Sequence, residues 1–200
     1  MKIVVDSNII FSALISGKEI YLEIFKKHKA YIPDIVLLEL LKYESRLIKK
    51  CKVKEDGFRM FTQLLFEELT VIPKFAISSM NWQKAYEICK DVDEKDTPFV
   101  ALSLELDVPL WTNDKKLGEG VKKKGFDRFV TVDEHLKRYV INLKEGKDYS
   151  LLFTFTSDSF CNLPRFAPSH LSPQAAERRS NFTFESLVNA KKASYIVKDY

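Results

Sequence analysis

Residues 96–114 read DTPFVALSLELDVPLWTND. The first half of this stretch predicts a helix from about Thr97 to Leu106, with Asp96 at its start, because apolar residues recur there at helical spacing. The apolar run from Val108 to Thr112 predicts a strand, and Asp114 follows it closely. The stretch therefore joins a helix to a strand and places one carboxylate before the helix and another just after the strand.

The same alternation extends in both directions from this stretch. The expected strands are residues 2–5, 30–32, 69–72, 108–112 and 129–132. The first expected helix begins at about residue 7. The others cover about residues 34–50, 54–68, 79–90, 97–106, 115–124 and 134–140. Strands that alternate with helices predict an α/β fold, a three-layer sandwich around a mainly parallel central sheet.

The composition is that of a folded protein, since 46% of the 200 residues are hydrophobic. The three cysteines are scattered, without a CxxC pair, which fits a reducing compartment and predicts a cytoplasmic protein. The amino-terminal apolar run ends at Asp6, too early for a signal peptide, and we expect no membrane partner. The net charge of +4 permits attraction to phosphate backbones but does not require it.

The composition changes near residue 147, which predicts a main domain over residues 1–147 and an appendage over residues 148–200. Residues 151–200 contain three of the seven prolines and six of the fifteen phenylalanines. Periodicity returns only from Phe184 to Val197. The appendage has no role that its sequence announces: a partner-binding arm, a disordered tail and an irregular terminus all remain open.

Three aspartates stand where an α/β sheet gathers its chemistry. Asp6 and Asp114 follow expected strands, and Asp96 begins a helix that points toward the same edge. Loops at the carboxyl ends of parallel strands converge on one crevice, so these carboxylates are expected to lie together. Each of them also suits a simpler role as a helix N-cap, and the two interpretations stay open.

Glu39 is the fourth acidic candidate because it interrupts an apolar run, IVLLELL at residues 35–41. A buried and unpaired carboxylate is costly, so Glu39 must tilt to solvent, pair with a cation such as Lys42, or face a metal ion. Four carboxylates in one pocket would repel one another unless a cation neutralised them. Oxygen ligands alone favour the hard ions Mg²⁺ and Mn²⁺.

In these features the sequence resembles the PIN-domain nucleases over about residues 1–140. The resemblance rests on VVDSNIIFSAL at residues 4–14, PDIVLLELL at residues 33–41, and the spacing of eighteen residues between Asp96 and Asp114. It implies a PIN-like fold and a Mg²⁺- or Mn²⁺-dependent ribonuclease. The implied catalytic residues are Asp6, Glu39, Asp96 and Asp114, and the implied metal ligands are Asp6, Asp96 and Asp114.

The resemblance also implies supporting roles for Asn8, Thr112 and Asn113, with Asp93 or Glu94 as a further acidic group. Small PIN proteins resemble toxins of the VapC type, which implies an RNA substrate, an antitoxin partner and a homo-oligomer. The rival hypothesis is a PIN-like module that binds RNA or protein without cutting it.

Other chemistries fit the sequence less well. A phosphotransfer enzyme with an aspartate nucleophile would need a second Asp where Asn8 stands, and Gly17 and Lys18 lack the remaining residues of a Walker loop. The three histidines lie far apart, which argues against a zinc site or a Ser-His-Asp triad.

Overall fold

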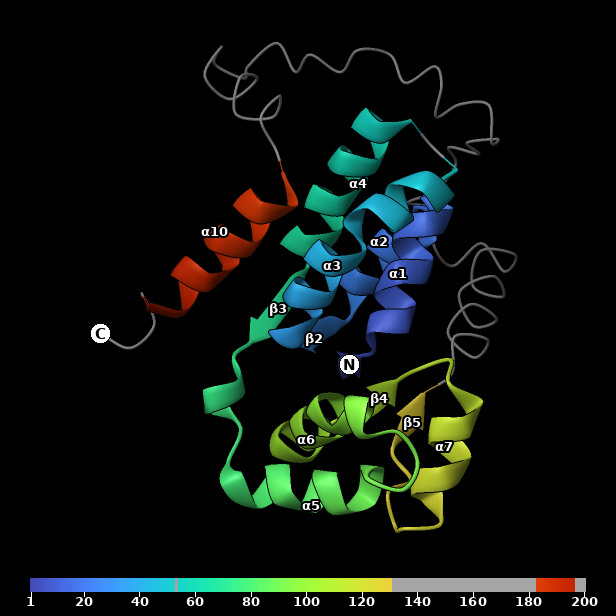
Figure 1. Ribbon diagram of the computed structural model, residues 1–200, viewed down its shortest axis with the longest axis vertical. Coiled ribbons are helices and arrows are strands. Elements are labelled where there is room, and N and C mark those ends of the chain that lie inside the picture. Colours follow the sequence, from blue (N-terminus) through green and yellow to red (C-terminus); the bar gives the residue numbers. More distant parts are fainter. Residues whose placement is uncertain (53, 131–182, 197–200) are drawn as a thin grey trace.

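The computed structural model describes residues 1–52, 54–130 and 183–196 (Figure 1). Its centre is a five-stranded sheet in which every neighbouring pair is parallel, in the order β3-β2-β1-β4-β5. The strands are β1 (Lys2–Val5), β2 (Lys29–Pro33), β3 (Leu69–Ile72), β4 (Leu110–Trp111) and β5 (Phe129–Val130). Ile3, Val4 and Val5 of the central strand are fully buried, as expected for a parallel strand covered on both faces.

Helices cover both faces of this sheet, so the predicted three-layer α/β fold is confirmed (Figure 1). One layer contains α1 (Ser7–Ser16), α2 (Ile20–Lys27), α3 (Ile35–Lys50) and α4 (Glu55–Glu67). The other contains α5 (Ser79–Cys89), α6 (Thr97–Leu106) and α7 (Lys115–Lys122). Two short 3₁₀ helices, η1 (Lys74–Ala76) and η2 (Glu94–Asp96), precede α5 and α6.

Some element boundaries differ from the sequence-based expectation. β4 begins at Leu110 rather than at residue 108, because Asp107 ends α6 in a left-handed conformation and the Val108 amide still donates to the Ser103 carbonyl. The sequence pattern did not single out α2, which follows the left-handed Gly17 that ends α1. The end of the expected strand 129–132 and the expected helix 134–140 lie outside the described residues.

The strand order creates one point where the connections change direction. From β1 the chain proceeds outward to β2 and β3 and then returns across the sheet to β4, which lies on the other side of β1. In open α/β sheets the crevice outside the carboxyl ends of two such strands is the usual place for a ligand. Asp6 follows β1 and Asp114 follows β4, so both predicted residues lie at this position.

Near the carboxyl terminus, α10 (Phe184–Ile196) packs against α3, as Figure 1 shows. Its Leu187 and Val188 side chains are buried in the same core as the sheet, and the Lys191 ammonium donates to the Leu69 carbonyl at 3.2 Å. The expected boundary at residue 147 falls outside the described residues, so the division into domains stays a prediction. Among the described helices, none is long and apolar enough to cross a bilayer.

Candidate active site

Asp6 is fixed at the start of α1 by four hydrogen bonds. One of its oxygens accepts from the Asn8 amide at 3.2 Å and from the Ser7 hydroxyl at 3.4 Å. The other accepts from the Asn8 side chain at 3.2 Å and from the Thr112 hydroxyl at 2.6 Å. The N-cap role is therefore real, and Asn8 supports Asp6 directly. Burial nevertheless raises the pKa of Asp6 above its usual value, although these hydrogen bonds oppose the shift.

Thr112 connects the ends of β1 and β4. The two strands pair in register from Val5 opposite Trp111, so the next residues, Asp6 and Thr112, lie side by side. The Thr112 hydroxyl donates to Asp6 and accepts from the backbone amide of Asp114 at 3.0 Å. One buried hydroxyl thus sets the position of Asp6 relative to the loop that carries Asp114.

Glu39 approaches the same place from α3. Burial raises the pKa of Glu39, and the negative charge of Asp6 raises it further. The Ser7 hydroxyl opposes this rise, and the positive charges of Lys42 and Lys95 oppose it more weakly. Its buried Oε2 atom has no hydrogen-bond partner among the described residues. Lys42 forms no salt bridge with Glu39 and instead lies over the Tyr43 ring. Of the three alternatives left by the sequence, a salt bridge with Lys42 is not formed, whereas Glu39 is partly exposed, so a tilt to solvent and a bound metal ion both stay open.

Asp96 lies at the junction of η2 and α6 and does not cap the helix with its side chain. Its pKa is raised to about 7, first by burial and then by the negative charges of Asp6, Asp93, Asp114 and Glu39. The other three predicted acidic residues therefore all influence the Asp96 carboxyl group. Capping is thus excluded for Asp96, whereas Asp114 does cap α7 by accepting from the Leu117 amide at 3.0 Å.

Of the two further acidic candidates, Asp93 and Glu94, Asp93 acts on the site because its negative charge helps to raise the pKa of Asp96. Its carboxylate also accepts from the Lys95 amide at 3.0 Å, so it caps the turn that leads to Asp96. Asn113 is exposed and lines a cavity beside Asp114.

The donor set fits a hard divalent cation in its chemistry. It consists of carboxylate oxygens, and none of the four predicted acids forms a salt bridge within the described parts of the chain. The unpartnered oxygen of Glu39 and the uncapped carboxyl of Asp96 are available as ligands. A direct bond from Asp6 would have to replace one of its four hydrogen bonds, the longest being that from Ser7.

The same carboxylates do not form a finished coordination shell. Over residues 1–52, 54–130 and 183–196, no three His, Cys, Asp or Glu side chains meet in the arrangement of a metal site. The acids are electrostatic neighbours whose side chains would have to move to share one ion. Which of them are ligands stays a prediction.

Sequence reasoning missed two features of the site. Ser7 donates to Asp6 and opposes the rise in the pKa of Glu39, a role that no local pattern in the sequence indicated. A cavity of about 280 Å³ adjoins Asp114, and α7 and Phe129 of β5 form much of its wall. No local pattern indicated this cavity, because it depends on how α7 packs beside β5.

Comparison with known proteins agrees with the geometry. A family model for the PIN domain matches residues 4–138, which is more than half of the chain and contains all four acids. Among curated proteins, no match was found. The fold, the position of the acids and this match together place the chain in the PIN-domain family, whose fold is of the nuclease type.

Proposed function

We propose that the protein is a divalent-metal-dependent ribonuclease that hydrolyses phosphodiester bonds of RNA. The observation that supports this proposal is that acidic side chains converge from the end of β1, from α3, from η2 and from the loop after β4. Among the described residues, no Lys or Arg forms a salt bridge that would neutralise these acids. Like charges held together in this way are stabilised by a cation.

The residues of the chain would have separate tasks in this reaction. Asp96, Asp114 and Asp6 would hold the cation, and Glu39 would complete the site directly or through water. A bound Mg²⁺ or Mn²⁺ supplies water activation and offsets the charge that develops on the phosphoryl oxygens. Thr112 would keep Asp6 and the Asp114 loop at a fixed separation, because its hydroxyl bonds to both.

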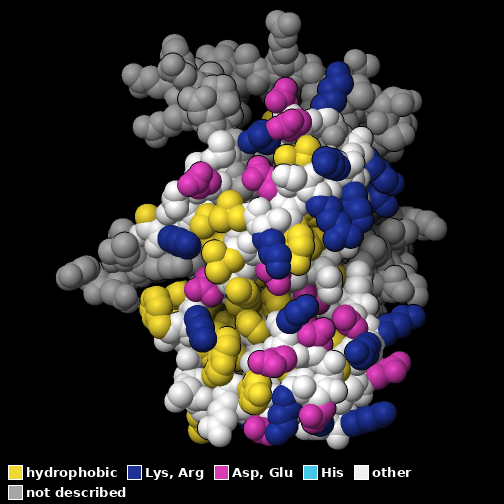
Figure 2. All heavy atoms as spheres, viewed as in Figure 1, with side chains coloured by type: hydrophobic (Ala, Val, Ile, Leu, Met, Phe, Trp, Pro, Cys, Tyr) yellow, Lys and Arg dark blue, Asp and Glu magenta, His cyan; other side chains and the backbone are white. Residues whose placement is uncertain are grey.

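Basic side chains near the site suit an RNA backbone. Figure 2 shows Lys and Arg side chains gathered over the upper right of one face, in the region of α3. The helix that carries Glu39 exposes Lys42, Arg46, Lys49 and Lys50. Lysine and arginine bind phosphates without regard to sequence, so this surface supports binding of a polyanion along the helix that carries Glu39.

The proposal is tested by incubating the full chain with end-labelled single-stranded RNA in Mg²⁺, in Mn²⁺ and in EDTA. We expect cleavage only with a divalent cation, and loss of cleavage in Asp96→Asn. The matched control is Asp34→Asn, because Asp34 follows β2 at the same edge of the sheet but bonds to the Lys74 amide. Binding of RNA without cleavage under every condition would instead favour the non-catalytic module.

The biological setting is a further part of the proposal and rests on the family resemblance. We propose that the protein acts as the toxin of a toxin–antitoxin pair and forms a homo-oligomer. Expression in a bacterial host should then arrest growth, and Asp96→Asn should relieve the arrest. Normal growth with active enzyme present would contradict the toxin role, and a monomer by light scattering would contradict the oligomer.

A further inference from the structure

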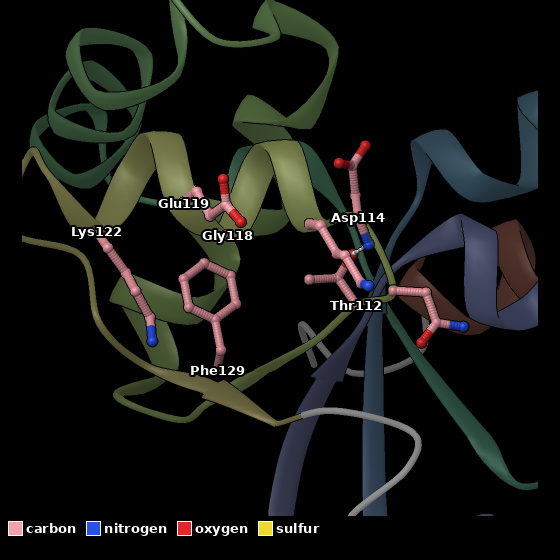
Figure 3. A pocket seen from close by; sticks show the side chains of 8 residues that line it. Thr112, Asp114, Gly118, Glu119, Lys122 and Phe129 are labelled. Carbon is pink, nitrogen blue, oxygen red and sulfur yellow. Dashed lines mark hydrogen bonds between the residues drawn. The ribbon is translucent and has the colours of Figure 1, made fainter.

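The cavity beside Asp114 adjoins the acidic site. Two of its lining residues, Thr112 and Asp114, belong to the acidic site. Figure 3 shows these two on one side of the cavity, while Glu119, Lys122 and Phe129 lie together on the other side. A molecule held in the cavity would therefore be in contact with a residue of the acidic site.

The size and the lining of the cavity restrict what it can hold. Its volume of about 280 Å³ is just below the range of about 300–1,000 Å³ that is usual for small-molecule sites. That is room for a single flat ring system. The wall includes Phe129 together with the charged residues Lys115, Glu119 and Lys122.

We propose that this cavity is a subsite for one nucleotide of the RNA, with the base against Phe129 and an adjoining phosphate on Lys122. This inference rests on the proposed function, because it places the subsite beside the phosphate that is cut. It adds to that function a nucleotide next to the cut phosphate, bound by Phe129 and Lys122 beside Asp114.

Phe129 is suited to receive a base. Its side chain is only partly buried, and its ring packs edge-on against Phe126 at 5.1 Å and 80°, which holds the ring in place. Bases of every kind have a π-face, so stacking on an aromatic ring supports binding of single strands with little sequence preference. The arrangement predicts binding of unpaired rather than double-stranded RNA.

Lys122 and Glu119 determine the orientation in which the nucleotide binds. Lys122 pairs with Asp127 at 3.1 Å, but both side chains are more than half exposed, so a phosphate can replace Asp127 at little cost. Glu119 repels phosphate and accepts hydrogen bonds from N–H groups, which bases carry and phosphates lack. The base is therefore expected on the side of Glu119 and the phosphate near Lys122.

The role of Phe129 is tested with two substitutions that preserve packing to different degrees. Phe129→Leu retains apolar volume against Phe126 but loses the aromatic face, whereas Phe129→Tyr retains both. Binding of fluorescent oligo(A) is measured in the Asp96→Asn background, so that the RNA is not cut. We expect Phe129→Leu to weaken binding by about tenfold and Phe129→Tyr to leave it nearly unchanged.

The role of Lys122 is tested by salt dependence, with Lys123→Ala as the control. Lys123 is the next residue, carries the same charge and is exposed, but it does not line the cavity. Loss of one phosphate contact should lower the slope of log Kd against log salt concentration by about 0.7 for a single strand. We expect this change in Lys122→Ala and a smaller one in Lys123→Ala.

Two results would overturn the subsite. One is wild-type affinity in Phe129→Leu with an unchanged melting temperature. The other is an equal effect of Lys122→Ala and Lys123→Ala, which would indicate diffuse attraction to a basic surface. Cleavage assays separate this failure from that of the proposed function. If Phe129→Leu cuts RNA with an unchanged KM, the protein lacks the subsite but remains a nuclease. If the wild-type protein never cuts RNA, it is not a nuclease.

Discussion

At the scale of single residues, the site is a balance between acids that repel one another and hydrogen bonds that fix them. Asp6 has both oxygens occupied by donors, whereas Asp96 has none from its own helix and is surrounded by four other carboxylates. The two aspartates therefore have different tasks. Asp6 is held in place by its donors, and Asp96 is the group that most needs a proton or a cation.

The pH dependence of stability follows from the pKa of Asp96. This group titrates near 7 in the folded protein and near 3.8 as an unperturbed side chain. Between these values the folded state binds a proton that the unfolded state has released, so the contribution of Asp96 to stability is most favourable at low pH and falls as pH rises toward 7. Urea denaturation in EDTA should show this fall between about pH 4 and pH 7, followed by a plateau.

Asp96→Asn supplies the control for this pH profile. Burial also raises the pKa of Asp6 and of Glu39, and both groups remain in the variant. The difference between wild type and variant therefore isolates Asp96, and the variant should gain relative stability as pH rises. Parallel profiles for the two proteins would show that Asp96 titrates normally.

Thr112 offers a second prediction at this scale. Thr112→Val keeps the shape of the side chain but removes the hydroxyl that donates to Asp6 and accepts from Asp114. We expect a loss of about 1–3 kcal/mol in the free energy of unfolding, because a buried carboxylate loses a donor. Thr112→Ser retains the hydroxyl and should lose much less in the same urea titration; equal losses would assign the effect to packing.

At the scale of elements, α7 matters because it touches both the cavity and the turn before Asp96. Its two glycines differ in their surroundings. A Cβ atom on Gly118 would meet nothing within 4 Å, whereas one on Gly120 would lie 2.7 Å from both methyl carbons of Val92. Val92 directly precedes Asp93, so the contact links α7 to the acidic turn.

These glycines form a matched pair for mutation. Gly118→Ala should stabilise the protein by up to about 1 kcal/mol through helix propensity, and Gly120→Ala should destabilise it by about 1–3 kcal/mol through overpacking. Thermal and urea denaturation measure both effects. Val92→Ala should relieve the strain in Gly120→Ala; no relief in the double variant would show that the clash lies elsewhere.

At the scale of the whole molecule, α10 closes part of the core. The segments that it contacts lie more than one hundred residues earlier in the chain. Leu187 and Val188 are buried, and Lys191 reaches the Leu69 carbonyl. The carboxyl-terminal helix therefore packs against the PIN fold beside α3 (Figure 1).

Leu187→Ala should therefore destabilise the entire fold by about 2–4 kcal/mol, because it leaves a cavity in the core. Asn189→Ala, an exposed change on the same helix, is the control. Both are measured by urea denaturation followed by far-ultraviolet circular dichroism. An unchanged midpoint for Leu187→Ala would mean that α10 does not contribute to the cooperative unit.

The sequence by itself determined the alternation of strands and helices and the positions of Asp6, Glu39, Asp96 and Asp114 within it, because hydrophobic periodicity and strand ends are local properties. Only the tertiary structure decided that β1 lies next to β4, and hence that the Thr112 hydroxyl meets an aspartate 106 positions away. It also decided that Ser7 serves two acids, that α7 and β5 enclose a cavity, and that α10 packs on α3. Such contacts depend on how distant segments pack together, and no periodicity within one segment specifies its neighbour.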